Sequence, residues 1–421
     1  MITVEEALEK ILAAVDVLQP ERKEILECLG QVLAEDVVSK INIPPHNNSA
    51  MDGYAVKFAD TRGASARRPV YLELIGEVAA GHVPAKAVKP GTAVRIMTGA
   101  PLPAGADAVV RFEDTDEVKG KGRGKGSRIG ILQPARRGQN IRLKGEDIRA
   151  GQAVLSKGTL LRPAQIGILA SLGRHAVRVI RRPIVSVLPT GDELCDIDQP
   201  LAPGKIYDSN SYAIAASILS CGGIPRLLNI GRDTIASLKR TIKSGLDADM
   251  LITSGGVSAG DYDVVKDVLG QMGKINFWTV RMKPGKPLAF GVIRSPRRGR
   301  PRPVPHLGLP GNPVSSMITF ELFARPAILK MLGIADYARP VITAVLDQEI
   351  TNSDGRRVFA RVHLKKKAGR WHASLTGPQG SGILMSMAVA SGLAIVPETR
   401  ARLKPGERVK VYLLEGSEGL Q

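Results

Sequence analysis

The stretch IVSVLPTGDEL at residues 184–194 sets the fold class, because an almost wholly apolar strand at 184–188 leads into a turn that contains Gly and two acids. The same pattern recurs downstream. We expect further strands at 225–230, 249–253, 275–281 and 306–309, and helices at 210–220, 233–244, 261–270 and 313–332. Apolar strands that alternate with helices are typical of a parallel sheet covered on both faces. Residues 181–335 are therefore predicted to form a three-layer α/β sandwich with a mostly parallel sheet.

The sequence before this region changes from helical to β character and back. Apolar residues at helical spacing predict helices at 4–15 and 25–32, and Thr3 and Glu6 have the spacing of a capping box. Short Val- and Ile-rich runs separated by Gly and Pro predict strands at 69–75, 93–97, 108–112 and 128–132, as in a small barrel or sandwich. Residues 141–180 are mixed, and Pro163 is expected to open a helix.

After residue 336 the pattern is that of strands again, at 341–346, 357–364, 371–375, 393–396 and 408–413. The predicted domains are a discontinuous, mixed helical N-terminal domain (1–40 and 141–180), a β insertion domain (41–140), the α/β domain (181–335) and a C-terminal β-barrel-like domain (336–421). A chain of 421 residues has room for two to four domains, so this division is reasonable.

Composition excludes several classes of protein. No apolar run approaches the ~18 residues of a membrane span, and the N-terminus carries Glu5, Glu6 and Glu9 in place of the basic start of a signal peptide. The three cysteines, Cys28, Cys195 and Cys221, form neither a disulfide framework nor a metal-ligand pattern. We therefore expect a cytoplasmic protein.

The net charge of +19 raises the question of a nucleic-acid partner. Much of the excess comes from three stretches, 119–128, 294–302 and 361–370, each with five basic residues and no acid. They are rich in Gly or Pro, or lie between predicted strands, so we interpret them as solvated loops. Almost no aromatic residues are interleaved with them, so a stacking surface for single-stranded nucleic acid is not expected.

Four loops at the carboxyl ends of the predicted parallel strands carry the candidate chemistry, since ligands of open α/β sheets bind there. They are PTGDEL (189–194), GRD (231–233), SGGVSAGDYD (254–263) and LPGNPVSS (309–316). Glycine lets backbone N–H groups converge on an anion, and a helix N-terminus adds its positive end. Hydroxyl donors would come from Ser254, Ser258 and Ser315. These loops favour a phosphate-bearing ligand.

Acidic side chains in these loops could hold Mg²⁺, which prefers oxygen ligands. They are Asp192, Glu193, Asp233 and Asp261. The alternative for Asp233 and Asp261 is simple N-capping of the helices that they precede, and Asn312-Pro313 is likewise a suitable N-cap and first-turn pair. The motifs GxxxxGK[ST], GxGxxG at a helix start and HExxH are absent, which argues against P-loop, dinucleotide and zinc-hydrolase sites.

Seven segments occur in an order that resembles one known family. They are SAMDGYAV (49–56), RIMTGAPLP (95–103), GQNIRLKGEDI (138–148), PTGDEL, SGGVSAGDYD, MKPGKP (282–287) and LPGNPVS. The chain resembles the MoeA-type molybdopterin molybdenumtransferases, which include the C-terminal domain of gephyrin. The resemblance implies insertion of molybdate into adenylyl-molybdopterin with release of AMP. It also implies a homodimer whose cleft lies between the α/β domain of one subunit and the β domain of the other.

The resemblance also implies roles for individual residues. Catalytic roles fall to Asp52, Thr98, Asp147, Glu193, Asp233 and Asp261. Substrate binding falls to Arg142, Ser254, Gly255, Gly256, Ser258, Lys283, Lys286, Arg294, Gly311, Asn312, Pro313 and Ser315. Magnesium would be held by Asp192, Glu193, Asp233 and Asp261. For Asp52 the alternative is an Asx-turn before Gly53.

Other functions stay open at this point. A molybdopterin adenylyltransferase shares the α/β domain but usually lacks the N-terminal domains; a gephyrin-like scaffold would need a further fused domain; and a basic RNA-binding protein would show steeply salt-dependent binding. The expected partners are adenylyl-molybdopterin, molybdate and a second copy of the chain. A molybdopterin adenylyltransferase and recipient molybdoenzymes are further candidate partners. Neither a membrane nor a nucleic acid is expected as a partner.

Overall fold

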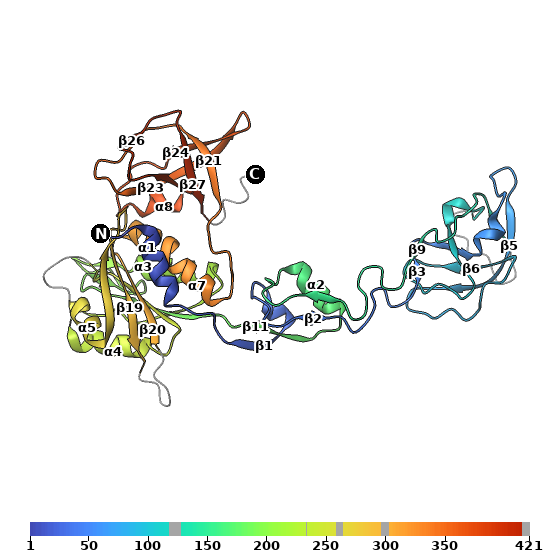
Figure 1. Ribbon diagram of the computed structural model, residues 1–421, viewed down its shortest axis with the longest axis horizontal. Helices are drawn as coiled ribbons and strands as arrows, with labels where there is room; N and C mark the ends of the chain where they lie inside the picture. The colour runs from blue at the N-terminus through green and yellow to red at the C-terminus, as the bar shows by residue number, and fades with distance from the viewer. Residues whose placement is uncertain (118–127, 233, 258–263, 296–302, 415–421) are drawn as a thin grey trace. The chain divides into compact units, whose positions relative to one another are not determined.

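The computed structural model describes residues 1–117, 128–232, 234–257, 264–295 and 303–414 (Figure 1). Contacts divide the chain into two compact units. The large unit comprises residues 1–23, 27–34 and 178–421, and the small unit comprises residues 24–26 and 35–177. Among the described helices, none is both long and apolar enough to span a membrane.

The central sheet of the large unit has six strands in the order β15-β12-β16-β20-β19-β17. Their bounds are β12 Ile184–Pro189, β15 Ile224–Leu227, β16 Met250–Ser254, β17 Gly273–Thr279, β19 Pro287–Arg294 and β20 Pro303–Leu309. The first four are mutually parallel, and only β19 runs antiparallel to both of its neighbours. The predicted mostly parallel sheet is confirmed, whereas β19 was not expected, because it follows β17 without an intervening helix.

Helices cover both faces of this sheet, which gives the predicted three layers (Figure 1). Side chains of α4 and α5 share one apolar core with β12, β16, β19 and β20, and α3 packs with α6 and α7 on the other side. The bounds are α3 Ser209–Ser220, α4 Ile235–Gly245, α5 Val264–Met272, α6 Pro313–Thr319, the π-helix η4 Phe320–Ala324 and α7 Arg325–Met331. Helix α4 is capped by Thr234, whose hydroxyl accepts from the Ser237 amide, and Asp233, for which capping was the alternative, lies outside the described residues.

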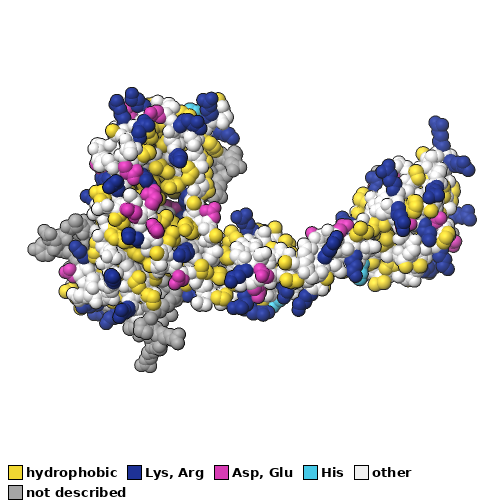
Figure 2. Space-filling view, viewed as in Figure 1, with side chains coloured by type: hydrophobic (Ala, Val, Ile, Leu, Met, Phe, Trp, Pro, Cys, Tyr) yellow, Lys and Arg dark blue, Asp and Glu magenta, His cyan; other side chains and the backbone are white. Residues whose placement is uncertain are grey.

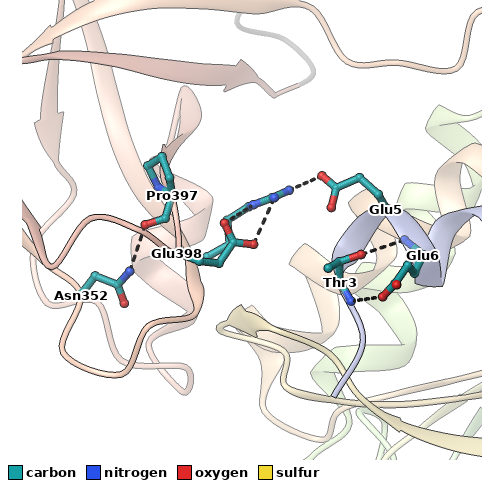
Figure 3. A network of polar contacts seen from close by, with 7 residues as sticks. Thr3, Glu5, Glu6, Asn352, Pro397 and Glu398 are labelled. Atoms are coloured by element: carbon teal, nitrogen blue, oxygen red, sulfur yellow. Dashed lines mark hydrogen bonds and ion pairs between the residues drawn. The ribbon is translucent and has the colours of Figure 1, made fainter.

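Helix α1, Val4–Ala13, belongs to the large unit by its contacts with η4 and α7, while residues 141–177 lie in the small unit. Its capping box is confirmed, since Thr3 and Glu6 each bond the other's backbone N–H (Figure 3). Arg357 pairs with both Glu5 of this helix and Glu398 of the C-terminal domain. The second predicted helix, at 25–32, is wrong, because only a 3₁₀ turn η1, Ile25–Cys28, forms there, directly after β1, Pro20–Glu24.

The C-terminal domain is a small closed barrel, because β23 pairs with both β24 and β25. All five predicted strands are present, as β21 Val341–Leu346, β23 Arg357–Lys367, β24 Arg370–Leu375, β25 Gly392–Val396 and β27 Arg408–Leu413. Short elements add β18 Met282–Lys283 beside β23, a pair β22 Ile350–Thr351 and β26 Arg402–Leu403, and helix α8 Leu384–Ala388. The segment 361–370 is therefore a β-hairpin, and its interpretation as a loop is wrong.

The small unit is built on a five-stranded sheet in the order β7-β4-β6-β5-β8, with apolar clusters on both faces. Its strands are β4 Gly53–Val56, β5 Val70–Val78, β6 Thr92–Ile96, β7 Ala108–Arg111 and β8 Arg128–Ile131. Four were predicted, but β4 was not, although the motif SAMDGYAV contains it. Short elements are β2 Val37–Val38, η2 Phe58–Thr61, η3 Phe112–Asp114, β10 Ala153–Leu155 and β11 Ala176–Ile180, and the predicted helix at Pro163 is α2 Pro163–Ser171.

Candidate functional site

The loops that carry the candidate chemistry meet at one edge of the central sheet, namely the edge formed by the carboxyl ends of its parallel strands. The last residues of β12, β16 and β20 stand side by side, since Pro189 pairs with Ser254 and Ser254 pairs with Leu309. A bridge between Thr190 and Gly231 adds the loop after β15. Four segments far apart in sequence are thus neighbours, as the rule for parallel strands predicts.

Hydrogen bonds join these loops directly. The backbone N–H and the hydroxyl of Thr190 both donate to the Ser254 carbonyl at 3.1 Å, and the Gly255 amide donates to the Leu309 carbonyl at 3.0 Å. The side-chain amide of Asn210, at the start of α3, Ser209–Ser220, reaches both Ser254 and Gly311. Sequence analysis did not single out Asn210.

Glycine lets two of the loops approach closely. Gly255 and Gly256 have φ angles of +94° and +64°, which side chains rarely tolerate. A Cβ on Gly255 would lie 2.9 Å from the Thr190 carbonyl oxygen, so there is no room for a side chain at this position. Among the described residues, a Cβ on Gly311 would meet only the Gly255 Cα, at 3.7 Å, which is an ordinary contact distance. The backbone of the two loops thus passes close together without a side chain of Gly255 or Gly311 between them.

The predicted metal ligands are divided between described and undescribed residues. Asp192 and Glu193 are exposed on the loop after β12, and the Glu193 carboxylate folds back over Gly191, where a Cβ would lie 2.4 Å from it. Lys205 and Arg232 donate to the Asp192 carbonyl. Asp233, Ser258 and Asp261 lie outside the described residues. Within the described ranges, no cluster of three or more His, Cys, Asp or Glu is close enough to hold a metal.

Two lysines stand beside the same edge. The segment MKPGKP precedes β19, which starts at this edge because Ala289 pairs with Gly308 near the end of β20. Lys283 and Lys286 are both exposed, and the Lys283 Nζ lies 3.9 Å from an Asp354 carboxylate oxygen. The glycine between the lysines, Gly285, packs against Thr319 of α6, since a Cβ there would come within 2.7 Å of the Thr319 methyl.

Arg294 lies at the opposite end of the strands, where the parallel strands begin. It pairs with Pro303, the first residue of β20, whereas the LPGNPVSS loop follows the last residue of that strand, Leu309. Six residues of extended strand span roughly 20 Å. The structure therefore does not bring Arg294 to the loops, and its expected place among the substrate-binding residues is corrected. Its assignment rested on the family resemblance alone, and the antiparallel course of β19 places its end far from the loops.

The start of α6 is only in part the anion site that was expected. Asn312 is at the N-cap position but its side chain makes no capping bond, and Pro313 has no N–H. The amide of Val314 is used by the barrel, since it donates to the Ser381 carbonyl at 3.0 Å. Ser315 is buried. Most of the donors at this edge therefore come from the loops and from α3.

A buried arginine of the barrel bonds the segment that contacts α6. Arg361 of β23 is 1% exposed, and it donates to the Ser386 hydroxyl at 3.1 Å and to the Pro378 and Gly380 carbonyls. No described carboxylate pairs with it, and burial lowers the pKa of its guanidinium. These contacts order residues 378–386, including Ser381. Sequence analysis assigned Arg361 to a solvated loop, and its identity in a basic run gave no signal of burial.

The small unit brings Asp52 and Thr98 together at the ends of β4 and β6. One carboxylate oxygen of Asp52 accepts from the Thr98 N–H at 2.6 Å and from its hydroxyl at 2.8 Å. These two bonds lower the pKa of Asp52, with a weaker contribution from the charge of Arg95. Asp52 is exposed, so it presents a permanent negative charge to solvent near neutral pH.

Arg142 lies close to this pair, whereas Asp147 lies further away. Arg142 of β9, Ile141–Arg142, pairs with Asn48 of β3, Asn48–Ser49, and the backbone of Ser49 bonds Gly99 and Ala100 beside Thr98. Asp147 bonds the Ile43 carbonyl, five residues further along the same ladder. Among the described residues, no hydrogen bond or ion pair joins Asp147 to Asp52. Basic side chains are visible on the surface of both units (Figure 2).

Comparison with known proteins covers almost the whole chain. Residues 2–173 match the MoeA N-terminal region (domain I and II), residues 186–330 a probable molybdopterin binding domain, and residues 343–414 the MoeA C-terminal region (domain IV).

Individual proteins give the same result. A molybdopterin molybdenumtransferase of Nostoc sp. is 40% identical over 91% of this chain and 86% of its own length. Molybdopterin molybdenumtransferase 2 of Mycobacterium tuberculosis is 37% identical over 98% of this chain and 99% of its own length. The crystal structure of a molybdopterin biosynthesis moeA protein from Pyrococcus horikoshii superposes with a TM-score of 0.79, at 35% identity, over 99% of this chain and 100% of that one. On this evidence the chain belongs to the MoeA family.

Proposed function

We propose that this protein is a molybdopterin molybdenumtransferase, which inserts molybdate into adenylyl-molybdopterin and releases AMP. The observation that carries the proposal is the in-register meeting of Pro189, Ser254 and Leu309 at one sheet edge, beside two lysines. Relatives at up to 40% identity are named for this activity. The resulting loops offer hydroxyl and backbone donors together with positive charge, which a phosphoanhydride and an oxyanion both require.

Positive charge at this edge has a specific purpose in the proposed reaction. Molybdate is a dianion, and binding it next to the phosphates of adenylyl-molybdopterin brings like charges together. Lys283 and Lys286 would offset this repulsion. Arg361, which no described carboxylate neutralises, supports this edge indirectly, because it holds residues 378–386, and Ser381 of that segment accepts from the Val314 amide of α6. The excess of cations therefore favours an anionic pair of ligands.

Asp52 is better suited to orient a group than to remove a proton. A carboxylate whose pKa is lowered by two hydrogen bonds is a weak base, because the ionised form is already stabilised. It retains a free oxygen that can bind a cation or accept from water. We infer that Asp52, with Thr98 and Arg142, orients water or substrate when the phosphoanhydride is cleaved.

Magnesium remains part of the proposal. Asp192 and Glu193 supply exposed carboxylates of the kind that Mg²⁺ prefers. With Asp233 and Asp261, which lie outside the described residues, they would hold the ion beside the phosphates. When bound, Mg²⁺ would neutralise charge on the pyrophosphate. The residues of this chain would orient the reactants and exclude water.

We further propose that the protein acts as a homodimer in the cytoplasm. Large apolar side chains are exposed on α3 and on the neighbouring edge strand β15, Ile224–Leu227; they are Tyr212, Leu219, Ile224 and Leu227. An open strand edge beside exposed apolar residues is a surface that proteins usually cover. We infer that a second copy of the chain covers this surface.

The substrate of the enzyme would come from a molybdopterin adenylyltransferase, and the product would pass to molybdoenzymes.

The main test measures AMP release from adenylyl-molybdopterin by chromatography, with and without molybdate. We expect release that depends on molybdate and on Mg²⁺. Well-folded protein that releases no AMP, or releases it equally without molybdate, contradicts the proposal. Formation of adenylyl-molybdopterin from ATP and molybdopterin would instead support the adenylyltransferase alternative.

A second test concerns the dimer. An Asp52→Asn variant is mixed with an Asp261→Asn variant, each of which we expect to be nearly inactive, and native mass spectrometry verifies that their subunits have exchanged. If each site uses residues of both subunits, about a quarter of wild-type activity should return, because half of the dimers are mixed and each contains one intact site. Exchanged dimers without recovered activity would mean that each site is completed within one chain.

A further inference from the structure

Asn210 joins two loops of the candidate site through one side chain. It lies in the first turn of α3, Ser209–Ser220, which is capped by Asp208 through the Ser211 amide. Its Nδ2 donates to the Ser254 Oγ at 2.9 Å and to the Gly311 carbonyl at 2.7 Å. Both are normal distances for strong hydrogen bonds. Asn210 therefore connects the end of β16 with the loop that follows β20.

The chemistry of the partners fixes which way the amide of Asn210 faces. The Gly311 carbonyl can only accept a hydrogen bond, so the NH₂ group, and not the oxygen, must point toward it. That NH₂ group has two hydrogens, and the two bonds use both. Only an asparagine amide at this position supplies two donors from one atom on so short a side chain. An aspartate of the same shape would supply none.

The bond from Asn210 also determines what the Ser254 hydroxyl can do. Because the Ser254 Oγ accepts from Asn210, its own hydrogen is left to donate elsewhere. No other bond to this hydroxyl is made by any described residue, and Ser254 is 4% exposed. A nearly buried hydroxyl with a free hydrogen at this edge is suited to donate to a bound anion. Asn210 thus sets the polarity of Ser254.

The same side chain controls the distance between the two glycine loops. A Cβ on Gly311 would lie 3.7 Å from the Gly255 Cα, so the two backbones pass close to each other. The Gly255 amide joins these loops at the sheet through the Leu309 carbonyl, and Asn210 adds a bond to the Gly311 carbonyl, two residues further along. Without Asn210, the Gly311 carbonyl would lose its link to α3 and to Ser254.

We propose that Asn210 is a positioning residue of this site, which holds the Ser254 and Gly311 loops together and turns the Ser254 hydroxyl toward the bound anion. The inference rests on the proposed function, because it assumes that the anion is the phosphate of adenylyl-molybdopterin or molybdate. It extends that function by assigning the geometry of the anion-binding loops to a helix residue outside them.

The first experiment compares Asn210→Ala and Asn210→Asp with Ser220→Ala. The control removes a hydroxyl from the same helix that bonds only the helix backbone. We expect kcat/KM for molybdate-dependent AMP release to fall by about ten- to a hundredfold in Asn210→Ala, as expected for two lost hydrogen bonds. Asn210→Asp should lose more, because its carboxylate repels the Gly311 carbonyl. Ser220→Ala should keep wild-type values.

Hydrogen exchange provides a readout that does not depend on activity. The Gly255 amide, which donates to Leu309, should exchange faster in Asn210→Ala, while amides in the centre of β12, Ile184–Pro189, should be unchanged. Unchanged exchange at Gly255 would overturn the proposed link between the loops. If wild-type protein shows no molybdate-dependent release, the proposed function fails, but this measurement still decides the role of Asn210.

A double-mutant cycle tests the effect through Ser254. If Asn210 acts by orienting that hydroxyl, part of the loss in Asn210→Ala should be absent in a Ser254→Ala background, so the two losses should not add. Fully additive losses would show that Asn210 does not act through Ser254 and would overturn that part of the proposal. A fall in melting temperature with unchanged kcat and KM would assign Asn210 a purely structural role and would overturn all of it.

Discussion

The two motif clusters of this protein are built with opposite polarity. At the sheet edge of the large unit, glycine loops, Ser254 and two lysines present donors and positive charge. In the small unit, Asp52 presents a carboxylate that is held ionised by Thr98. The first cluster suits the binding of anions, and the second suits the orientation of a cation or of water. The difference indicates a division of labour between binding and orientation.

The clusters also use glycine for different reasons. A Cβ on Gly53, next to Asp52, would lie 2.0 Å from the Val110 carbonyl oxygen of the neighbouring strand. A Cβ on Gly311, in contrast, would meet only the Gly255 Cα, at 3.7 Å, among the described residues. Gly53 is thus required by the packing of the sheet, whereas no described neighbour excludes a side chain at Gly311. Substitutions should separate these two cases.

The largest effect is expected for Gly53→Ala. The added methyl group collides with backbone that cannot move without breaking the β4–β7 pairing, so we expect a loss of about 3 kcal/mol or more in the stability of the small unit. Thermal unfolding followed by circular dichroism measures this. The matched control is Gly76→Ala, in the same sheet, where a Cβ meets nothing within 4 Å. Equal melting curves for both variants would contradict the packing requirement.

The next largest effect is expected for Asp52→Asn. The amide can still accept from Thr98 but carries no charge, so the fold should be kept while turnover falls about 100-fold, as expected when a reacting group loses its orientation. AMP release measures turnover, and thermal unfolding checks the fold. Asp60→Asn serves as the control, because Asp60 also accepts a backbone N–H, from Gly91, in the same unit. Near-normal turnover in Asp52→Asn would reduce Asp52 to an Asx-turn residue.

Much of the site in the large unit follows from sequence, because parallel strands end at one edge. Once 184–188 and 249–253 are recognised as strands, the loops after them must be neighbours. The strand at 287–294 was not predicted, and Arg294 was placed at the site by the family resemblance alone. The antiparallel course of β19, Pro287–Arg294, sends Arg294 to the far edge, and no local signal in an apolar run reveals its direction.

Other features depend on tertiary contacts that sequence does not contain. Arg361 lies on the outer face of β23, between the inward residues Ala360 and Val362, and is buried only because residues 378–386 cover it. Asn210 lies near a helix start, where Asn usually acts as a cap, but Asp208 has that role and leaves the amide free to join two loops. Neither the burial of Arg361 nor the two bonds of Asn210 could be predicted from the motifs.

A smaller effect is expected for the lysines of the anion-binding cluster. Lys286→Gln should raise the KM for adenylyl-molybdopterin about tenfold, as expected for a lost charged hydrogen bond. Lys283→Gln should change it less, because the Asp354 carboxylate at 3.9 Å already offsets part of that charge. Both increases in KM should become smaller at high salt, where exposed charges are screened.

Steady-state kinetics at two ionic strengths measures these changes. Lys274→Gln is the control, since Lys274 is exposed on β17, Gly273–Thr279, and pairs with Val292 at the edge far from the loops. An equal rise in KM for Lys274→Gln would mean that the overall charge of the protein, and not the cluster, attracts the substrate.

The smallest effect is expected for Thr98→Val, which keeps the backbone bond to Asp52 but removes the hydroxyl bond. The pKa of Asp52 is lowered in the folded protein by these two bonds, so its charge and its contribution to stability are present at neutral pH and are lost as the pH falls through that lowered pKa. Losing one donor raises the pKa toward its usual value. The acid limb of the pH profile of kcat/KM should therefore move to higher pH, with little change at neutral pH.

Thr92→Val, which removes a hydroxyl with two local bonds at the other end of β6, Thr92–Ile96, should leave the limb in place. An acid limb that is the same in both variants would show that the ionisation of Asp52 does not limit the reaction, and the polarity of the small-unit cluster would then have no catalytic meaning.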